Sequence, residues 1–240
     1  MPNLKFVQDK THDAYMVMTM FKIDDSAGLE SRANSMGINL EVAQKIRELD
    51  QESAEKLIEP IMEERYKAIG DKLEITSKWY QQSWDEINDQ FFSFVAEKTK
   101  HEWKFSEYFC VVSVVHPGLS DWQGNKITRI WSENPFTMRK ITAHELILAH
   151  IFSIFHYDPK YQKMLSDQQV WKIAEISAWC LTGLEPEMLK FWPWIPKSKL
   201  FYYTHNYPML VELQKKLKVV YEKSDFETYL NEAVKLVKTT

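Results

Sequence analysis

The sequence predicts an α+β, mostly helical protein in which a small sheet packs on one long helix. The chain has 240 residues but only 6 glycines and 9 prolines, and this scarcity suits long helices better than a turn-rich β-sandwich or barrel. Apolar residues recur every three or four positions through most of the chain, which is typical of amphipathic helices. Between residues 105 and 133 this spacing gives way to short β-branched runs, which indicate strands.

Composition bounds the classes of protein to consider. Hydrophobic residues make up 45% of the chain, enough for a sizeable core in one large domain or two small ones. We divide the chain into residues 1–104, an N-terminal strand and helical region, and residues 105–240, which contain the predicted sheet and the C-terminal helices. The alternative is one continuous domain. Nothing in the sequence indicates an oligomeric state.

Charge and targeting signals point away from nucleic acid and membranes. The formal net charge of -4 provides no field that attracts a polyanion. The N-terminus lacks the basic and apolar regions of a signal peptide, and no apolar run is long enough to span a membrane. Cys110 and Cys180 lie in apolar runs, where cysteine acts as a small hydrophobe, so we expect no disulfide. The expected compartment is the cytoplasm.

In the first hundred residues the sequence predicts one strand and several helices. Residues 13–23 are short and rich in β-formers, which favours a strand. Residues 40–69 favour two helices, with Pro60 marking a break or a new first turn. Residues 77–99 carry a stripe of aromatic and aliphatic residues at helical spacing, and we interpret this stripe as core.

The second part of the chain begins with two predicted strands, 108–115 and 126–131. Ten residues separate them, too many for a tight two-residue hairpin, so turn chemistry does not fix how they pair. Helical spacing then returns, with Asn134 as a predicted N-cap and Ser166 with Gln169 as a capping box. The expected segments are a helix at 135–157, a helix at 167–181, an irregular or broken-helical region at 185–208, and a final helix or helix pair at 209–237.

The predicted 135–157 helix carries the most informative residues of the chain. Apolar residues lie on every face of this predicted helix, which indicates that it is buried on most sides. His144, Glu145, His150 and His156 interrupt this apolar surface. An ionised carboxylate is strongly destabilised in an apolar environment unless it is paired, so a metal ion or a polar cleft is expected beside it.

At His144-Glu145 the sequence resembles the zincin metallopeptidases, and among them the gluzincins. Their helical motif is His-Glu-x-x-His, in which two histidines one turn apart bind zinc and the glutamate activates the metal-bound water. The resemblance, which covers about 105–182, implies that His144 is a zinc ligand and Glu145 the catalytic base. It also implies that Glu175, on the next predicted helix, is a further ligand, and that a strand edge before the motif helix holds a peptide substrate.

The sequence departs from the motif at the second histidine. Leu148 stands one turn after His144, whereas His150 is turned about 120° away and lies about 9 Å further along the helix axis. Two hypotheses follow. Either a bulge in the helix brings His150 to the metal, so that zinc is held by His144, His150 and Glu175, or the protein is a degenerate zincin that has lost its metal.

Other side chains near the motif have alternative interpretations. Glu175 also suits a surface ion pair with Lys172, three residues earlier on the same predicted helix. His150 and His156 also suit positions in the core or a cleft. By the same resemblance, Tyr202, Tyr203 and His205 are candidates for a donor that stabilises an oxyanion.

Two main functions therefore compete. The first is a zinc-dependent hydrolase that acts on peptide or amide bonds, with a peptide or protein as its substrate. The second is a catalytically inactive, zincin-like interaction protein, which Leu148 favours. A third hypothesis, a nucleic-acid-binding module, rests on the resemblance of residues 36–43 to a helix-turn-helix turn. Acidic residues in the helix that follows count against it.

Overall fold

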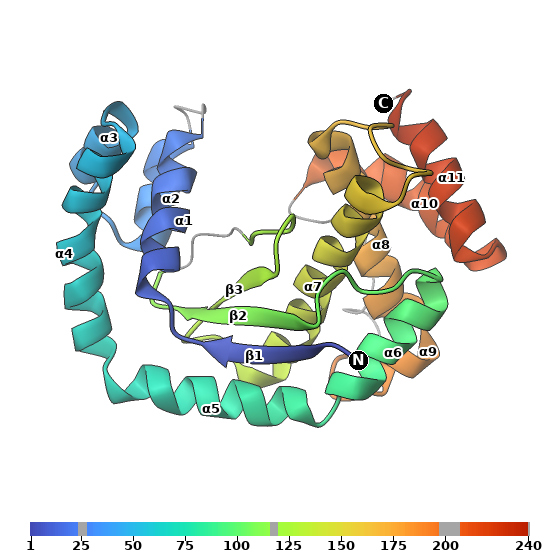
Figure 1. Ribbon diagram of the computed structural model, residues 1–240, viewed down its shortest axis with the longest axis horizontal. Helices are drawn as coiled ribbons and strands as arrows, with labels where there is room; N and C mark the ends of the chain where they lie inside the picture. Colours follow the sequence, from blue (N-terminus) through green and yellow to red (C-terminus); the bar gives the residue numbers. More distant parts are fainter. Residues whose placement is uncertain (24–27, 116–119, 197–206, 240) are drawn as a thin grey trace.

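The protein is an α+β, mostly helical fold with one small sheet (Figure 1). The computed structural model describes residues 1–23, 28–115, 120–196 and 207–239. The elements follow in the order β1 (Asn3–Val7), α1 (Lys10–Lys22), α2 (Leu29–Met36), α3 (Leu40–Glu48), α4 (Gln51–Ile69), α5 (Asp71–Asp85), α6 (Asn88–Thr99), β2 (Glu107–Ser113), β3 (Lys126–Ile130), α7 (Pro135–Tyr157), α8 (Asp167–Leu184), α9 (Pro186–Leu189), the 3-10 helix η2 (Pro208–Leu210), α10 (Val211–Lys223) and α11 (Phe226–Val237).

The sheet has three parallel strands in the order β1-β2-β3. Leu4 pairs with Tyr108 across the first ladder, and Cys110 pairs with Ile127 across the second. The two strands predicted near 108–131 therefore pair with each other, in parallel. A parallel pair needs a crossover of a dozen or more residues, which explains the long connection between β2 and β3. The central strand, β2, comes from the middle of the chain, whereas β1 comes from its first residues.

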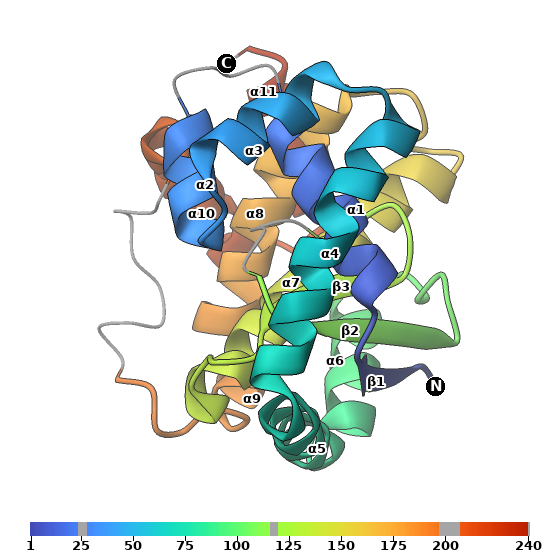
Figure 2. The same ribbon diagram turned by 90° about the vertical axis from the view of Figure 1, so that its left-hand side faces the viewer.

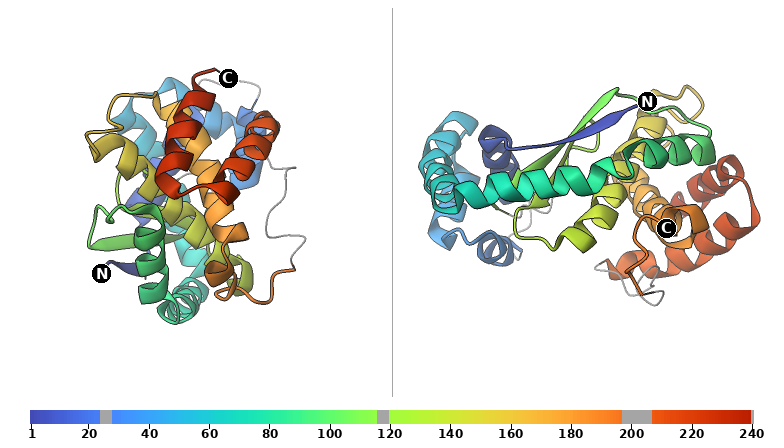
Figure 3. Two further views of the ribbon diagram at one scale, coloured as in Figure 1. Left: turned by 90° about the vertical axis from the view of Figure 1, so that its right-hand side faces the viewer. Right: turned by 90° about the horizontal axis from the view of Figure 1, so that it is seen from below.

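Helices surround this sheet in two groups. α1 to α4 lie together at one end of it, as Figure 2 shows from that side. α5 runs alongside β1 and joins this group to α6 (Figure 1 and Figure 3, right). α7 and α8 lie side by side at the other end, with α10 and α11 packed outside α8 (Figure 3, left). Buried side chains from both groups belong to one hydrophobic cluster.

Side chains from the helices occupy the outer edge of β1. Gln81 on α5 donates from Nε2 to the Leu4 carbonyl (3.0 Å) and accepts from the Phe6 amide at Oε1 (2.8 Å). Asn88 on α6 accepts from the Leu4 amide at 3.2 Å. An edge strand otherwise presents unpaired backbone groups to other chains, so these contacts satisfy a part of the sheet that is open to pairing.

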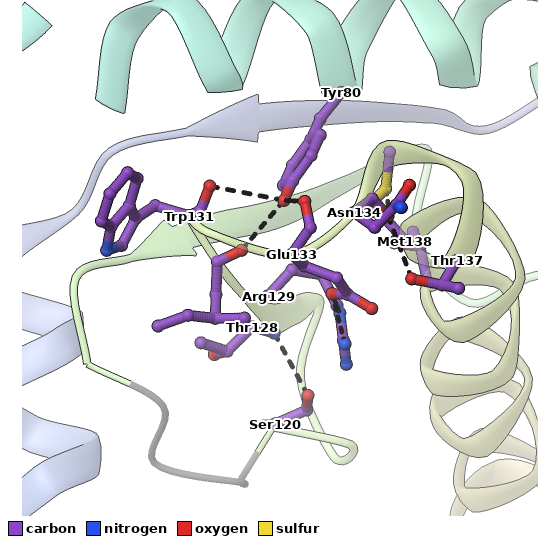
Figure 4. Close-up of polar contacts among 11 residues, drawn as sticks. Tyr80, Ser120, Thr128, Arg129, Trp131, Glu133, Asn134, Thr137 and Met138 are labelled. Atoms are coloured by element: carbon purple, nitrogen blue, oxygen red, sulfur yellow. Dashed lines mark hydrogen bonds and ion pairs between the residues drawn. The ribbon is translucent and has the colours of Figure 1, made fainter. Parts of the chain in front are cut away.

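The outer edge of β3 is also engaged by its own chain. The Asp121 amide donates to the Lys126 carbonyl (2.9 Å), and the Thr128 amide donates to Ser120 Oγ (3.2 Å). The Tyr80 hydroxyl lies 2.7 Å from the Glu133 carbonyl and 3.1 Å from that of Ile130. Figure 4 shows Tyr80 reaching this turn from α5. α5 thereby holds the turn that leads from β3 into α7.

One expectation for the N-terminal region is corrected. Residues 13–23 are not a strand, because Lys10–Lys22 form α1. The Asp9 side chain caps this helix by accepting from the His12 amide at 2.9 Å, and methionine, which is frequent here, is a good helix former. The N-terminal strand is instead β1, where buried Leu4 and Phe6 alternate with more exposed residues.

The other helix predictions differ from the structure mainly at their boundaries. Residues 40–69 form two helices as expected, but they meet at Asp50, the N-cap of α4, and Pro60 lies inside α4. Residues 77–99 fall in two helices, α5 and α6, rather than in one. Their predicted core stripe is confirmed, with Tyr80, Trp84 and Phe91 fully buried.

The remaining helices of the second half match the sequence. α7 begins at Pro135 and ends at Tyr157, and Ser166 and Gln169 form the predicted capping box at the start of α8. The 209–237 segment is the pair α10 and α11. Cys110 and Cys180 are both buried and free. In the described parts of the chain, no helix is long and apolar enough to cross a membrane.

Candidate functional site

His144 and Glu175 meet where α7 packs against α8. His144 Nε2 lies 3.0 Å from Glu175 Oε2, and the two residues are only 7% and 4% exposed. Apolar residues on the remaining faces of both helices hold the helices together, so the two polar side chains point at each other inside the interface. The structure thus brings together the two residues that the resemblance pairs as ligands.

Two tryptophans donate to the carboxylates at this site. Trp122 Nε1 donates to Glu145 Oε2 at 2.9 Å, and Trp171 Nε1 donates to Glu175 Oε1 at 3.1 Å. Both oxygens of Glu175 are therefore engaged, one by an imidazole and one by an indole. We call His144, Glu145, Glu175, Trp122 and Trp171 the His144 cluster.

Further aromatic and basic side chains line the cluster. The Trp179 ring centre is 5.1 Å from that of His144, and Lys140 Nζ lies 4.8 Å from the same Trp179 ring. Burial lowers the pKa of Lys140 to about 8. Tyr207 packs edge-on against Trp171 with ring centres 4.9 Å apart. Burial raises the pKa of Tyr207 to about 12, and the Glu175 and Glu145 carboxylates add to the shift.

The two other histidines of α7 lie outside the cluster. His150 is fully buried, with Nε2 2.9 Å from Thr99 Oγ1 and its ring 4.4 Å from that of Trp103. Burial lowers the pKa of His150 to about 3, with His101 adding to the effect. His156 Nε2 lies 3.1 Å from Asp167 Oδ1 at the end of the helix. These contacts match a core histidine and a surface pair.

α7 is an uninterrupted α-helix from Pro135 to Tyr157. The bulge that would bring His150 round to His144 is therefore absent from this helix, and the proposed ligand set of His144, His150 and Glu175 is not assembled. Leu148, one turn after His144, is fully buried. A regular helix places the side chain at this position, not at position 150, on the stripe of His144.

Two further expectations concern Glu175 and the segment before Tyr207. Glu175 is not a surface residue paired with Lys172, because it is buried and bonds to His144 and Trp171. Tyr202, Tyr203 and His205, named as candidate oxyanion donors, lie outside the described residues.

The donor set does not fit a three-ligand zinc site. Among the described residues, no group of three His, Cys, Asp or Glu side chains is placed to hold a metal ion. A histidine that binds a metal through one ring nitrogen normally donates its other N–H to a carboxylate, a carbonyl or water. Nδ1 of His144 is buried and has no hydrogen-bond partner within the described ranges. The cluster therefore offers two zinc-type ligands, and no described side chain or carbonyl supports Nδ1 of its imidazole in this way.

Sequence reasoning missed the aromatic residues of the cluster. Trp171 and Trp179 stand four positions before and after Glu175, and Lys140 stands four before His144, so helical spacing alone places them beside the pair. Trp122 lies in the loop before β3, and the sequence carries no signal for its contact with Glu145.

Comparison with models of protein families, with curated proteins and with solved structures finds no match to this chain.

Proposed function

We propose that this protein is a catalytically inactive, zincin-like binding protein whose His144 cluster recognises a peptide or protein partner. The observation that carries the proposal is Leu148, a fully buried leucine at the position where a gluzincin has its second histidine. A structural or catalytic zinc site normally has at least three protein ligands. Here the described residues supply His144 and Glu175 and no third.

The accessible part of the cluster suits binding. Trp122, Glu145, Trp171 and Tyr207 are each partly exposed, whereas His144 and Glu175 are buried behind them. Tryptophan and tyrosine are enriched among the residues that contribute most to protein interfaces, because they bury a large area and still donate a hydrogen bond. A carboxylate among them selects for hydrogen-bond donors on the partner.

The proposal is tested by metal content and hydrolysis. Protein purified without a metal-affinity column is incubated with zinc, dialysed and analysed for metal, and is then assayed against a mixed peptide library. We expect less than one tenth of an equivalent of zinc and no cleavage. Leu148→His places an imidazole one turn from His144 and should raise zinc binding towards one equivalent, whereas Leu148→Asn, a polar control, should not.

A second candidate function is a zinc-dependent hydrolase acting on peptide or amide bonds, and the 3.0 Å contact between His144 and Glu175 favours it. Two ligand atoms on a tetrahedral zinc lie about 3.3 Å apart, so this pair needs only a small shift to accept the ion. On this hypothesis Glu145 is the proton acceptor. One equivalent of zinc in the unmodified protein, together with cleavage lost in Glu145→Gln and zinc lost in His144→Ala, would establish this function and refute the binding protein.

A further inference from the structure

A cavity of about 620 Å³ lies between α1 and α4 in the N-terminal helical group. Its volume is within the usual range for small-molecule sites. None of the His144 cluster lines it, so a ligand bound in this cavity is independent of the proposed function. The lining residues are Asp9, Lys10, Thr11, His12, Ala14, Tyr15, Met18, Gln51, Glu55, Glu59, Met62 and Lys126.

The positively charged and amide donors of this cavity are used by the protein itself. Lys126 Nζ donates to Asp9 Oδ2 at 2.7 Å. Lys10 forms an ion pair with Glu63, at the edge of the cavity. Gln51 donates from Nε2 to Glu55 Oε1 at 3.0 Å. A ligand that needs strong donors from the wall, such as a phosphate or a carboxylate, therefore finds them already engaged.

The carboxylate acceptors on α4 are only partly used, because the contact with Gln51 occupies one oxygen of Glu55. Glu55 and Glu59 stand one turn apart on α4, and neither makes an ion pair within the described part of the chain. His12 is only 9% exposed, and its ring contacts Thr128 Oγ1 through Nε2 at 3.4 Å. Its other ring nitrogen, Nδ1, has no hydrogen bond to any described residue. Burial, and next the nearby Lys126, lower the pKa of His12, which favours the neutral imidazole, and its unprotonated nitrogen can accept a hydrogen bond.

The rest of the lining is apolar or aromatic. Met18 and Met62 are buried, and Tyr15 on α1 is 52% exposed. Methionine thioethers and a tyrosine ring pack well against methylene groups, and an aromatic face attracts an ammonium group. The cavity thus combines partly used acceptors with surface for a short aliphatic chain.

We propose that this cavity binds a small aliphatic diamine. Glu55 and Glu59 are about 6 Å apart along the helix axis, a spacing that two ammonium groups on a short methylene chain can match. One ammonium group donates to Glu55 and the other to Glu59 or His12, while the chain covers Met18 and Met62. Three carboxylates against two ammonium groups in the lining leave the site with a negative balance that favours a cation.

Calorimetric titration with putrescine tests the proposal. We expect saturable one-to-one binding to the full chain and at least a tenfold weaker affinity in the double variant Glu55→Gln, Glu59→Gln. The matched control is Glu52→Gln, Glu64→Gln, which removes the same charge from exposed positions of α4 outside the cavity and should leave affinity within twofold. Circular dichroism of each variant confirms that α4 is intact.

Two further sets of measurements distinguish specific binding of a diamine from general attraction between charges. Butanediol, which has the same chain without charge, and succinate, which has the opposite charge, should not bind. His12→Phe keeps the ring volume, removes the acceptor and should weaken putrescine binding severalfold. The proposal is overturned by no binding of putrescine at millimolar concentration, by equal binding of butanediol, or by equal weakening in the two double variants.

Discussion

Asp13 is a fully buried carboxylic acid on α1 that links three elements. Its Oδ2 accepts from the Val114 amide after β2 and from the Tyr66 hydroxyl on α4, both at 3.0 Å, while Oδ1 is buried without a partner among the described residues. Burial raises the pKa of Asp13 from 3.8 to about 6. The folded state therefore holds this proton more tightly than the unfolded state does.

The stability that Asp13 contributes is present below about pH 4 and is lost as the pH rises through 6. In Asp13→Asn, one oxygen still accepts both hydrogen bonds and the ionisation is gone. We compare the unfolding free energy of the variant with that of the unmodified protein. The difference, variant minus unmodified, should rise by up to about 3 kcal/mol between pH 4 and pH 8. Urea denaturation across this range measures it, and parallel curves for the two proteins would contradict it.

His150 gives the opposite pH dependence. Its pKa falls from 6.5 to about 3 on burial, so the unfolded state takes up a proton first and the folded state is destabilised as the pH drops below 6.5. His150→Gln keeps a hydrogen-bonding group near Thr99 but does not titrate. Between pH 6.5 and pH 4, we expect the unmodified protein to lose about 3 kcal/mol more unfolding free energy than this variant. Acid denaturation of both proteins tests this, with His156→Gln, a surface histidine, as the control that leaves the loss unchanged.

At the scale of single residues, the sequence predicted the meeting of His144 and Glu175 but not what surrounds it. The pair was found through a family resemblance, because the two residues lie on different helices and no local spacing connects them. The prediction that His150 binds the metal was wrong because it assumed a distortion of the helix. Apolar packing around α7 keeps that helix regular. Trp122 reaches Glu145 from a loop, and only tertiary packing determines such a contact.

At the scale of elements, the strongest periodic patterns gave correct helices, and weak or ambiguous patterns gave the errors. The 13–23 segment has β-forming residues, yet an N-cap at Asp9 and a buried helical face outweigh that preference. β1 was missed because its alternation covers only five residues. The parallel pairing of β2 and β3 depends on a crossover connection. Local sequence patterns such as turn residues do not predict the course of such a connection.

The turn between β3 and α7 leads into the helix that carries His144, and the Tyr80 hydroxyl bonds to two carbonyls of this turn. In Tyr80→Phe, the carbonyls of Ile130 and Glu133 lose their shared donor inside the protein, and we expect the unfolding free energy to fall by about 1 to 2 kcal/mol. The rate of backbone amide hydrogen exchange should increase in residues 130–138 of the variant. Tyr15→Phe, at a half-exposed ring, is the control, and an equal effect in both variants would show that the Tyr80 hydroxyl has no special role.

At the scale of the whole molecule, the sheet joins the two regions into which the sequence was divided. β1, α5 and α6 belong to residues 1–104, and they pair with or cover strands that belong to residues 105–240. Fully buried Tyr108 and Cys110 on the central strand lose part of their cover when the first region is removed. A domain boundary near residue 104 would therefore cut through a packed core.

We expect a fragment of residues 105–240 to lack cooperative unfolding and dispersed amide proton signals when it is expressed alone. The physical reason is the apolar area that β1 and α5 cover in the intact chain, whose exposure to water is unfavourable. Adding a separately produced fragment of residues 1–104 should restore the signals by complementation. A folded 105–240 fragment with a sharp thermal transition would show that the second region is an independent domain.

If the protein binds a peptide as proposed, the side chains on the sheet edges affect how selective that binding is. A peptide that joins a sheet as an extra strand is held by main-chain hydrogen bonds, which are the same for almost every sequence. Gln81 and Asn88 take these bonds at β1, while Ser120, Asp121 and Tyr80 take them at β3. Discrimination then falls to side-chain contacts, so exchanging single residues of a bound peptide should change its affinity far more than methylating its backbone amides.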